Sequence, residues 1–316
     1  MTTAGRIPAD RGLTTRMFLT GLFLVILYCV FGAILWVAFK SFVIVFVVIF
    51  GLLFLQYWFS DKIALWGMHG RIVTPEQAPQ LHGAVDRLCA LANMPKPRVA
   101  IADTDMPNAF ATGRSPKSAV VCATSGILRR LDEPELEAVL AHELSHVAHR
   151  DVAVMTIASS LGVLAGLLTR MMLFATMFGG RGGGRNQSAG QLVLLELMVM
   201  LVSIAVYAIS YLLTMALSRY RELAADRSGA LLIGRPSLLA SALVKVSGDM
   251  ARIPTRDLRK AEAFNAFFFT PAITQRPGQG GQGGGFSLSA LFSTHPSLER
   301  RLAQLSQLEA QLGQPR

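Results

Sequence analysis

Four long apolar runs divide the chain and alternate with polar segments. The first pair, 17–39 and 41–59, contains no charged residue and is separated by a single lysine. The second pair falls within 152–217, contains one charge in each run, and flanks a Gly/Arg-rich stretch at 179–190. A helix of about 20 apolar residues crosses a bilayer core of roughly 30 Å, so each run is long enough to span a membrane. We predict two transmembrane helical hairpins, the first at 17–59.

Two hairpins would place the other three parts of the chain on one side of the membrane. These parts are a basic tail at 1–16, a first polar segment at 60–151 and a second polar segment at 218–316. More Lys and Arg residues flank the spans on this side than lie in the two turns, a bias typical of the cytoplasmic side. We therefore expect both polar segments to face the cytoplasm. An outward-facing orientation remains the alternative, because long domains count little in this rule.

The first polar segment combines predicted helices with short predicted strands. Thr74-Pro75-Glu76-Gln77 matches a capping box and predicts a helix that runs to about residue 91. Asp132-Glu133-Pro134-Glu135 predicts the start of a second helix. Between them, apolar and β-branched stretches with Gly113 and Pro116 as breaks predict three strands. The predicted strands are 98–101, 108–112 and 118–123.

The second polar segment predicts three helices, at 218–232, 236–250 and 296–312, the last with leucines at helical spacing. The sequence RPGQGGQGGG at 276–285 has too few apolar residues to bury a core, so it predicts a flexible loop. The whole pattern predicts a mainly α-helical membrane protein with a small β-sheet.

The composition agrees with a protein that lies partly in a membrane and partly in water. Hydrophobic residues make up 52% of the chain and charged residues 16%, too apolar for a purely soluble protein and too charged for a bundle wholly in lipid. The net charge of +10 fits an anionic membrane surface or a nucleic acid. No basic and aromatic binding pattern accompanies the spans, so we expect a lipid bilayer and no nucleic-acid partner. Three scattered cysteines without metal-type spacing indicate a reducing compartment.

The sequence AVLAHELSHVAHRD at 138–151 contains three histidines within eight residues. His142 and His146 lie one turn apart on the same face of the predicted helix, so both rings can reach one metal ion. Glu143 lies one position further round, where it can serve as general base without ligating the metal. This H-E-x-x-H arrangement is typical of zinc peptidases. The sequence therefore predicts one Zn²⁺ per chain.

A catalytic zinc needs a third protein ligand and an open fourth position. His149 shares the face of the other two histidines, but it lies roughly 10 Å along the helix from His142 at 1.5 Å per residue. Zinc–nitrogen bonds are only about 2 Å long, so we expect His149 to be an interfacial residue or a partner of a ligand.

The segment Ser218–Asp226 (SRYRELAAD) offers the third ligand. Glu222 and Asp226 lie one turn apart on a predicted helix; Glu222 can ligate, and Asp226 can accept a hydrogen bond from the free N–H of a ligand histidine. The small Ala224 and Ala225 allow two helices to approach closely. The same residue types also fit a solvated surface on which the two acids pair with neighbouring arginines. H-E-x-x-H on the same side of the membrane favours the metal site.

These motifs resemble the HtpX group of integral-membrane zinc metalloproteases, which belongs to the gluzincin class and is related to the CaaX prenyl proteases. The order of H-E-x-x-H, a transmembrane hairpin and E-x-x-A-D carries the resemblance over nearly the whole chain. Pro107-Asn108-Ala109-Phe110-Ala111 resembles the family's strand above the catalytic cleft. Ser293-Thr294-His295-Pro296, followed by Arg301, resembles its C-terminal motif, although the Gly/Gln-rich stretch before His295 departs from the family pattern.

The resemblance implies a gluzincin-like zinc metallopeptidase domain built from 60–151 and 218–316. It implies that His295 stabilises the oxyanion and that Arg301 orients His295 or the C-terminal helix, whereas the residue types alone would leave both as solvated surface groups. Substrate would lie extended along Asn108, Ala109, Phe110 and Ala111. Asn108 could instead be only a turn residue after Pro107.

The resemblance further implies an endopeptidase of the bacterial inner membrane that takes part in the stress response. Its substrates would be unfolded polypeptides, cut on the cytoplasmic segments of misfolded or damaged membrane proteins. A dedicated processing peptidase of the CaaX kind is an alternative, although four spans are few for the enclosed chamber of such enzymes. A metal-bound membrane scaffold without catalysis is another, and the carboxylate of Glu143 counts against it.

Overall fold

The chain forms two compact units. In the computed structural model one unit comprises Met1–Leu13, Phe59–Ala153 and Ser218–Arg316, and the other comprises Thr14–Trp58 and Val154–Leu217. The structure describes residues 11–39, 47, 51, 54–55, 57–151, 154–155, 165–166, 169–170, 187–250, 269 and 295–313. The predicted flexible loop at 276–285, the lysine of the first turn and residues 179–186 of the second turn lie outside this part of the chain.

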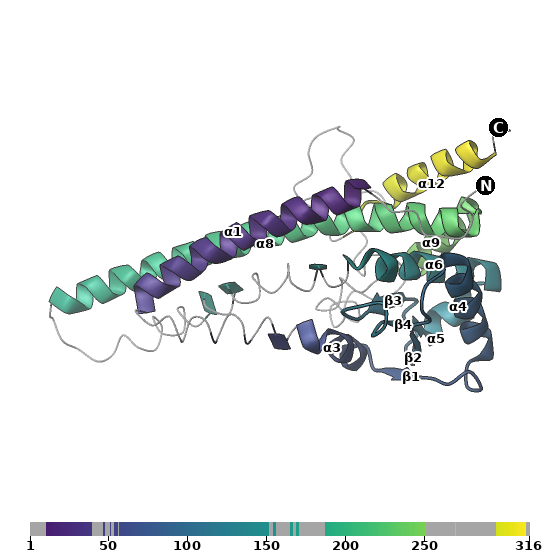
Figure 1. Ribbon diagram of the computed structural model, residues 1–316, viewed down its shortest axis with the longest axis horizontal. Coiled ribbons are helices and arrows are strands. Elements are labelled where there is room, and N and C mark those ends of the chain that lie inside the picture. The colour runs from purple at the N-terminus through teal and green to yellow at the C-terminus, as the bar shows by residue number, and fades with distance from the viewer. Residues whose placement is uncertain are drawn as a thin grey trace. The chain divides into compact units, whose positions relative to one another are not determined.

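Two helices of the described part are long and apolar enough to cross a membrane (Figure 1). They are α1, Arg11–Phe39, and α8, Gln187–Ile233. Large apolar side chains stand exposed on both, among them Phe18 and Leu194. Lipid would cover such side chains in a membrane protein. Helix α8 is continuous over 47 residues, where the sequence predicted a span and a separate helix.

A four-stranded sheet lies in the unit that contains the histidine helix (Figure 1). Its spatial order is β1-β2-β4-β3; β2 and β4 run parallel, and the other two pairs are antiparallel. The three predicted strands are confirmed with boundary shifts of one or two residues. The first strand was missed, because three residues show no alternating pattern. The strands are Gly70–Ile72 (β1), Arg98–Ala102 (β2), Ala109–Thr112 (β3) and Val120–Thr124 (β4).

The helix predicted to begin at Thr74 begins later. Helix α4 spans Pro79–Ala92, with proline in its first turn. Thr74 and Gln77 form a turn instead, in which the Thr74 backbone N–H donates to the Gln77 side-chain oxygen at 3.0 Å. The Gln77 and Ala78 N–H groups both donate to the Thr74 carbonyl. Half of the capping box therefore forms, but around a turn that ends before the helix.

The capping box before the histidine helix is confirmed. Helix α6 spans Glu133–His149; the Asp132 side chain accepts from the Glu135 N–H, and the Glu135 side chain accepts from the Asp132 N–H. The other end is closed by Arg150, whose φ of 55° is left-handed. Helix α6 packs among α4 and the sheet (Figure 1), and 12 of its 17 residues are buried. A buried helix with fixed ends can position its side chains accurately.

Four further helices complete the described part. Helix α9 lies beside α6, and Glu135 on α6 accepts hydrogen bonds of 2.6 Å from Ser241 and from Lys245 on α9. The predicted helices at 236–250 and 296–312 are confirmed, the latter two residues shorter. The helices are α3, Ser60–Gly67; α5, Ser125–Arg130; α9, Pro236–Met250; and α12, Leu298–Leu312. The fold is thus mainly helical with a small sheet, as predicted.

Candidate metal site

Three predicted ligands converge on one point. His142 Nε2 and His146 Nε2 lie 3.2 Å apart, and each lies 3.5 Å from an oxygen of the Glu222 carboxylate. A tetrahedral ion with bonds of about 2.05 Å would hold its ligand atoms about 3.3–3.4 Å apart. The spacing of these three side chains therefore fits one metal ion of this size. In the described part of the chain, His142, His146 and Glu222 are the one group of His, Cys, Asp or Glu side chains close enough together to hold a metal ion.

Helix α8 reaches the histidine helix at a glycine. A Cβ added to Gly229 would lie 2.8 Å from the backbone nitrogen of His142, closer than a side chain can come. Ala225, one turn earlier on α8, is fully buried. The sequence indicates Ala224 and Ala225 as the small residues of this contact, but its local pattern does not indicate Gly229. Glu222 reaches the histidines because these small residues let the backbone of α8 approach α6.

His142 is held by a carboxylate and an arginine. Its Nδ1 lies 2.9 Å from Asp226 Oδ1, as the sequence predicted for Asp226. Arg301 donates two hydrogen bonds to Asp226, of 2.6 and 2.7 Å, and a third of 2.7 Å to the Phe269 carbonyl. The Arg301 side chain is 1% exposed and the Asp226 side chain is buried. Arg301 therefore acts on Asp226, and the solvated position that its residue type suggested is wrong.

His146, like His142, lies beside a carboxylate that an arginine contacts, and the sequence did not indicate these two partners. Its Nδ1 lies 2.9 Å from Asp151 Oδ2, and Arg221 Nε lies 3.1 Å from the same oxygen. Burial of Asp151 disfavours its charge, but Arg221 and then His146 outweigh burial and hold the pKa of this carboxyl below its usual value. Arg221 thus pairs with Asp151, not with Glu222 or Asp226 as the solvated-surface alternative required. Asp151 lies only two residues beyond the end of α6, and that proximity to His146 was the available signal.

Glu143 lies beside the converging ligands without joining them. It is 4% exposed, and its carboxylate accepts a hydrogen bond from the backbone of Ala111 on β3. Burial raises the pKa of Glu143, against the opposing charges of His142 and His146. Burial disfavours protonation of His142, but Asp226 and Glu222 outweigh it and raise the pKa of His142 to about 9. The carboxylates of this cluster therefore stabilise a positive charge at His142.

The formal charges of the cluster suit a divalent cation. Four buried carboxylates gather here, against two buried guanidinium groups. Two negative charges remain, and an uncompensated charge in a buried site is costly. A bound dication would neutralise them. The carboxylates belong to Glu143, Asp151, Glu222 and Asp226, and the guanidinium groups to Arg221 and Arg301.

The remaining predicted residues surround this cluster. His295 is 3% exposed, and its Nδ1 lies 3.3 Å from a Glu222 oxygen, so it is not a surface group. The Asn108 side-chain oxygen accepts a hydrogen bond of 2.8 Å from the Phe269 backbone N–H. Ala109, Phe110 and Ala111 are buried on β3. His149 lies outside the ligand group, 3.5 Å from the Ser228 hydroxyl, as the distance argument predicted.

Comparison with known proteins places the site in a family. The sequence profile described as peptidase family M48 matches residues 75–309. The chain is 57% identical to "Protease HtpX homolog 1" of Streptomyces coelicolor over 98% of this chain and 97% of that protein. It is 52% identical to "Protease HtpX homolog" of Moorella thermoacetica, over 98% and 99% of the two chains. The crystal structure of S. mikatae Ste24p shares the fold with a TM-score of 0.52 and 18% identity, over 94% of this chain and 67% of that one.

Proposed function

The chain belongs to peptidase family M48 and is a membrane metalloprotease, and on that premise we propose a zinc-dependent endopeptidase mechanism and a role for each site residue. One observation carries the proposal: three side chains meet at metal-ligand spacing, and a buried carboxylate that does not ligate lies beside them.

We propose that His142, His146 and Glu222 hold one Zn²⁺. Two imidazoles and one carboxylate are a common donor set of catalytic zinc, and three protein ligands leave the fourth position open. When bound, the ion would supply a Lewis acid that polarises the peptide carbonyl and activates water. Asp226 and Asp151 fix the Nδ1–H tautomers of the two histidines, so that each Nε2 carries the lone pair that ligates.

Glu143 is the proposed general base and acid. Its carboxylate would take a proton from the attacking water and pass it to the departing amine. The raised pKa of Glu143 suits this task, because it brings the proton affinity of the carboxylate closer to neutral pH. A site that only holds a metal needs no such carboxylate, which disfavours the scaffold alternative.

The open edge of β3 is the proposed substrate groove. In an antiparallel pair, alternate residues turn their backbone groups toward the partner strand. The Thr124 N–H donates to the Asn108 carbonyl, so Phe110 and Thr112 face β4 while Ala109 and Ala111 face the open edge. An extended substrate would pair there by main-chain hydrogen bonds, beside Glu143, with weak sequence preference.

Asn108 and His295 are the proposed contacts at either side of the scissile peptide. The Asn108 amide holds the backbone N–H of Phe269, which supports the proposal that it can hold a peptide main chain. His295 lies beside Glu222, where its ring could donate to the oxyanion. Arg301 positions Asp226, and so acts on the metal site through His142.

We further propose a multi-pass protein of two hairpins in the cytoplasmic membrane, with the active site facing the cytoplasm. The basic residues that flank the apolar runs support this orientation. The substrates would be cytoplasmic segments of misfolded or damaged membrane proteins. A dedicated CaaX-like processing role would instead require a defined cleavage site in one substrate.

Incubation of the zinc-loaded, detergent-solubilised protein with an unfolded membrane protein tests the mechanism. Glu143→Gln should keep its metal and its thermal stability but cleave about 10²–10⁴ times more slowly, the usual contribution of a general base. Glu137→Gln, a partly exposed carboxylate on the same helix that pairs with Arg87, is the matched control and should cleave at the rate of the unsubstituted protein. Cleavage by Glu143→Gln at the unsubstituted rate would overturn the assignment.

A further inference from the structure

The side chain of Phe269 packs against a metal ligand and has no role in the proposed mechanism. Phe269 is 2% exposed. Its ring lies nearly perpendicular to the His142 ring, at 85°, with the two ring centroids 5.1 Å apart. Perpendicular aromatic pairs have a preferred geometry, because the positive edge of one ring is attracted to the negative face of the other. This contact therefore favours one orientation of the His142 ring.

The same ring contacts the arginine that supports His142. The Arg301 guanidinium carbon lies over the Phe269 ring, 5.0 Å from its centroid, and Arg301 Nη1 donates to the Phe269 carbonyl at 2.7 Å. Arg301 also binds Asp226, which lies 2.9 Å from His142 Nδ1. Each of the four residues thus contacts the next, and the series returns to its first member. Phe269 is the one apolar residue among the four.

Both backbone groups of Phe269 are bound by side chains. Its N–H donates to the Asn108 side-chain oxygen at 2.8 Å, and its carbonyl accepts the hydrogen bond from Arg301. Asn108 is 0% exposed and Arg301 is 1% exposed. Hydrogen bonds of both backbone groups to buried partners hold a residue as firmly as pairing in a strand does. The location of the Phe269 ring is therefore fixed without help from His142.

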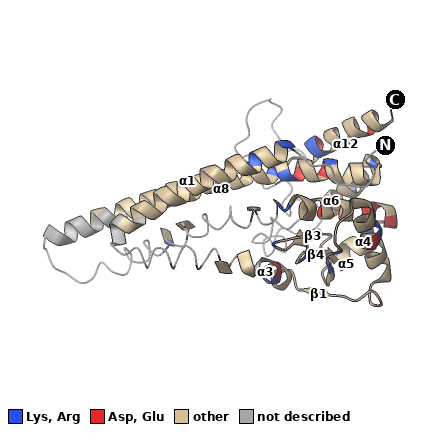
Figure 2. Cartoon of the chain, viewed as in Figure 1, with Lys and Arg blue, Asp and Glu red and all other residues tan. Residues whose placement is uncertain are grey.

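The apolar ring lies in charged surroundings. Figure 2 shows basic and acidic residues interspersed at the end of α8 and at the beginning of α12. Hydrogen bonds between such groups are stronger where water is excluded. Without the ring, the space would be lined by His142 and Arg301, and water enters a cavity that has polar walls. Water in this space would compete with Asp226 for the N–H of His142.

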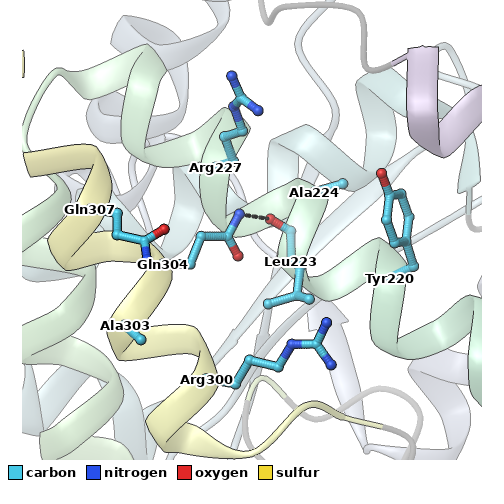
Figure 3. A pocket seen from close by; sticks show the side chains of 8 residues that line it. All are labelled: Tyr220, Leu223, Ala224, Arg227, Arg300, Ala303, Gln304 and Gln307. Carbon is cyan, nitrogen blue, oxygen red and sulfur yellow. Dashed lines mark hydrogen bonds between the residues drawn. The ribbon is translucent and has the colours of Figure 1, made fainter. Parts of the chain in front are cut away.

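The attachment of α12 to α8 does not depend on Phe269. The Gln304 amide, about one turn beyond Arg301, donates to the Leu223 carbonyl at 3.0 Å (Figure 3). Arg301 itself donates two hydrogen bonds to Asp226. These contacts would hold Arg301 in place if the Phe269 ring were removed. The residue that would lose a constraint is His142.

We propose that Phe269 is a positioning residue for the metal. Its ring holds the His142 imidazole in the orientation that directs Nε2 at the ion, and it keeps water from the hydrogen bond between His142 and Asp226. The proposal rests on the proposed function, in which His142 is a metal ligand. Because Phe269 acts through His142, its loss should weaken metal binding without abolishing it.

The test compares Phe269→Ala with the unsubstituted full-length protein in detergent. Three quantities are measured: the Zn²⁺ dissociation constant by competition with a chromophoric chelator, the visible absorption of the Co²⁺-loaded protein, and the melting temperature without metal. The absorption of Co²⁺ depends on the arrangement of its ligands. Leu243→Ala is the matched control, since Leu243 is another large, fully buried side chain of the same core.

Phe269→Ala should raise the Zn²⁺ dissociation constant about 3- to 10-fold, the range that one aromatic pair contributes, and should shift the Co²⁺ absorption. Leu243→Ala should lower the melting temperature by a similar amount and leave both metal measurements unchanged. Phe269→Leu fills most of the space without an aromatic ring, and it replaces Phe269→Ala if that variant does not fold. It should bind Zn²⁺ more tightly than Phe269→Ala and less tightly than the unsubstituted protein.

Two results would overturn the positioning role. One is an unchanged dissociation constant and Co²⁺ absorption in Phe269→Ala, and the other is an equal change in Leu243→Ala; each would leave Phe269 as a core residue alone. His142→Ala distinguishes these results from a failure of the proposed function, because it should abolish metal retention. If His142→Ala retains the metal, the ligand assignment is wrong and the role of Phe269 is wrong with it.

Discussion

Gly229→Ala tests whether the metal site depends on the close approach of α8 to α6. The added Cβ would lie 2.8 Å from the backbone nitrogen of His142 and 2.9 Å from its Cα. Ordinary contacts between such atoms begin at about 3.5 Å, so the two backbones must separate by about 0.7 Å. Turning a side chain cannot relieve the overlap, because the atoms that it meets belong to the backbone of a buried helix.

The separation would reach a ligand directly. Glu222 lies seven residues before Gly229, two turns earlier on the same face of α8. Metal–ligand distances tolerate a change of only about 0.2 Å, so we expect metal affinity to fall about 10- to 100-fold. Overpacking should also lower the free energy of unfolding by about 1–3 kcal/mol. Alanine recovers up to about 1 kcal/mol of this as the better helix former.

The measurement is the metal dissociation constant of purified, solubilised protein, obtained by competition with a chromophoric chelator. Thermal unfolding with and without metal gives the accompanying change in stability. Gly248→Ala is the matched control, since it makes the same substitution in α9, where the added Cβ meets no atom within 4 Å. The control should keep the unsubstituted affinity. If Gly229→Ala keeps it too, the reasoning from helix approach is refuted.

Two further substitutions examine the residues around the ligands. Asp151→Asn should lower metal affinity about 10- to 100-fold, because it removes the charge that holds the His146 N–H and leaves Arg221 uncompensated. The control Asp86→Asn, in an exposed ion pair, should change neither metal affinity nor stability appreciably. Equal metal affinities in the two variants would contradict the role of Asp151 as the partner of His146. Glu222→Ala should abolish metal retention while His149→Ala retains it, and metal analysis that found the reverse would exclude Glu222 as the third ligand.

The parts of the site that the sequence predicted are those that depend on short spacings. His142, Glu143 and His146 fall within one turn and a little more of a helix, and a capping box marks where that helix begins. Helical geometry alone then fixes which side chains share a face. The same reasoning placed Glu222 and Asp226 one turn apart on α8, where the structure has them.

The parts that the sequence did not predict depend on contacts between distant segments. Arg221 meets Asp151 across 70 residues of sequence, and nothing in either local pattern indicates the pair. Gly229 lies within a helical pattern, where glycine is only a poor helix former until the partner helix is known. The turn at Thr74 shows the opposite error, since a local pattern that favours a helix start was overridden by the proline at position 79.

The two ligand histidines are supported in the same way, each by a carboxylate and an arginine, and α8 contributes a residue to each support. His142 is held by Asp226, which Arg301 holds in turn; His146 is held by Asp151, which Arg221 holds in turn. In each support, the guanidinium group lowers the cost of burying the carboxylate, and the carboxylate fixes the histidine tautomer. Arg221 and Asp226 flank the third ligand, Glu222, within six residues of α8. A change in the rotation or height of this one helix would therefore disturb the third ligand and both supporting pairs together. The close approach at Gly229 sets that rotation and height, which is why a methyl group placed there should affect the metal more than it affects the fold.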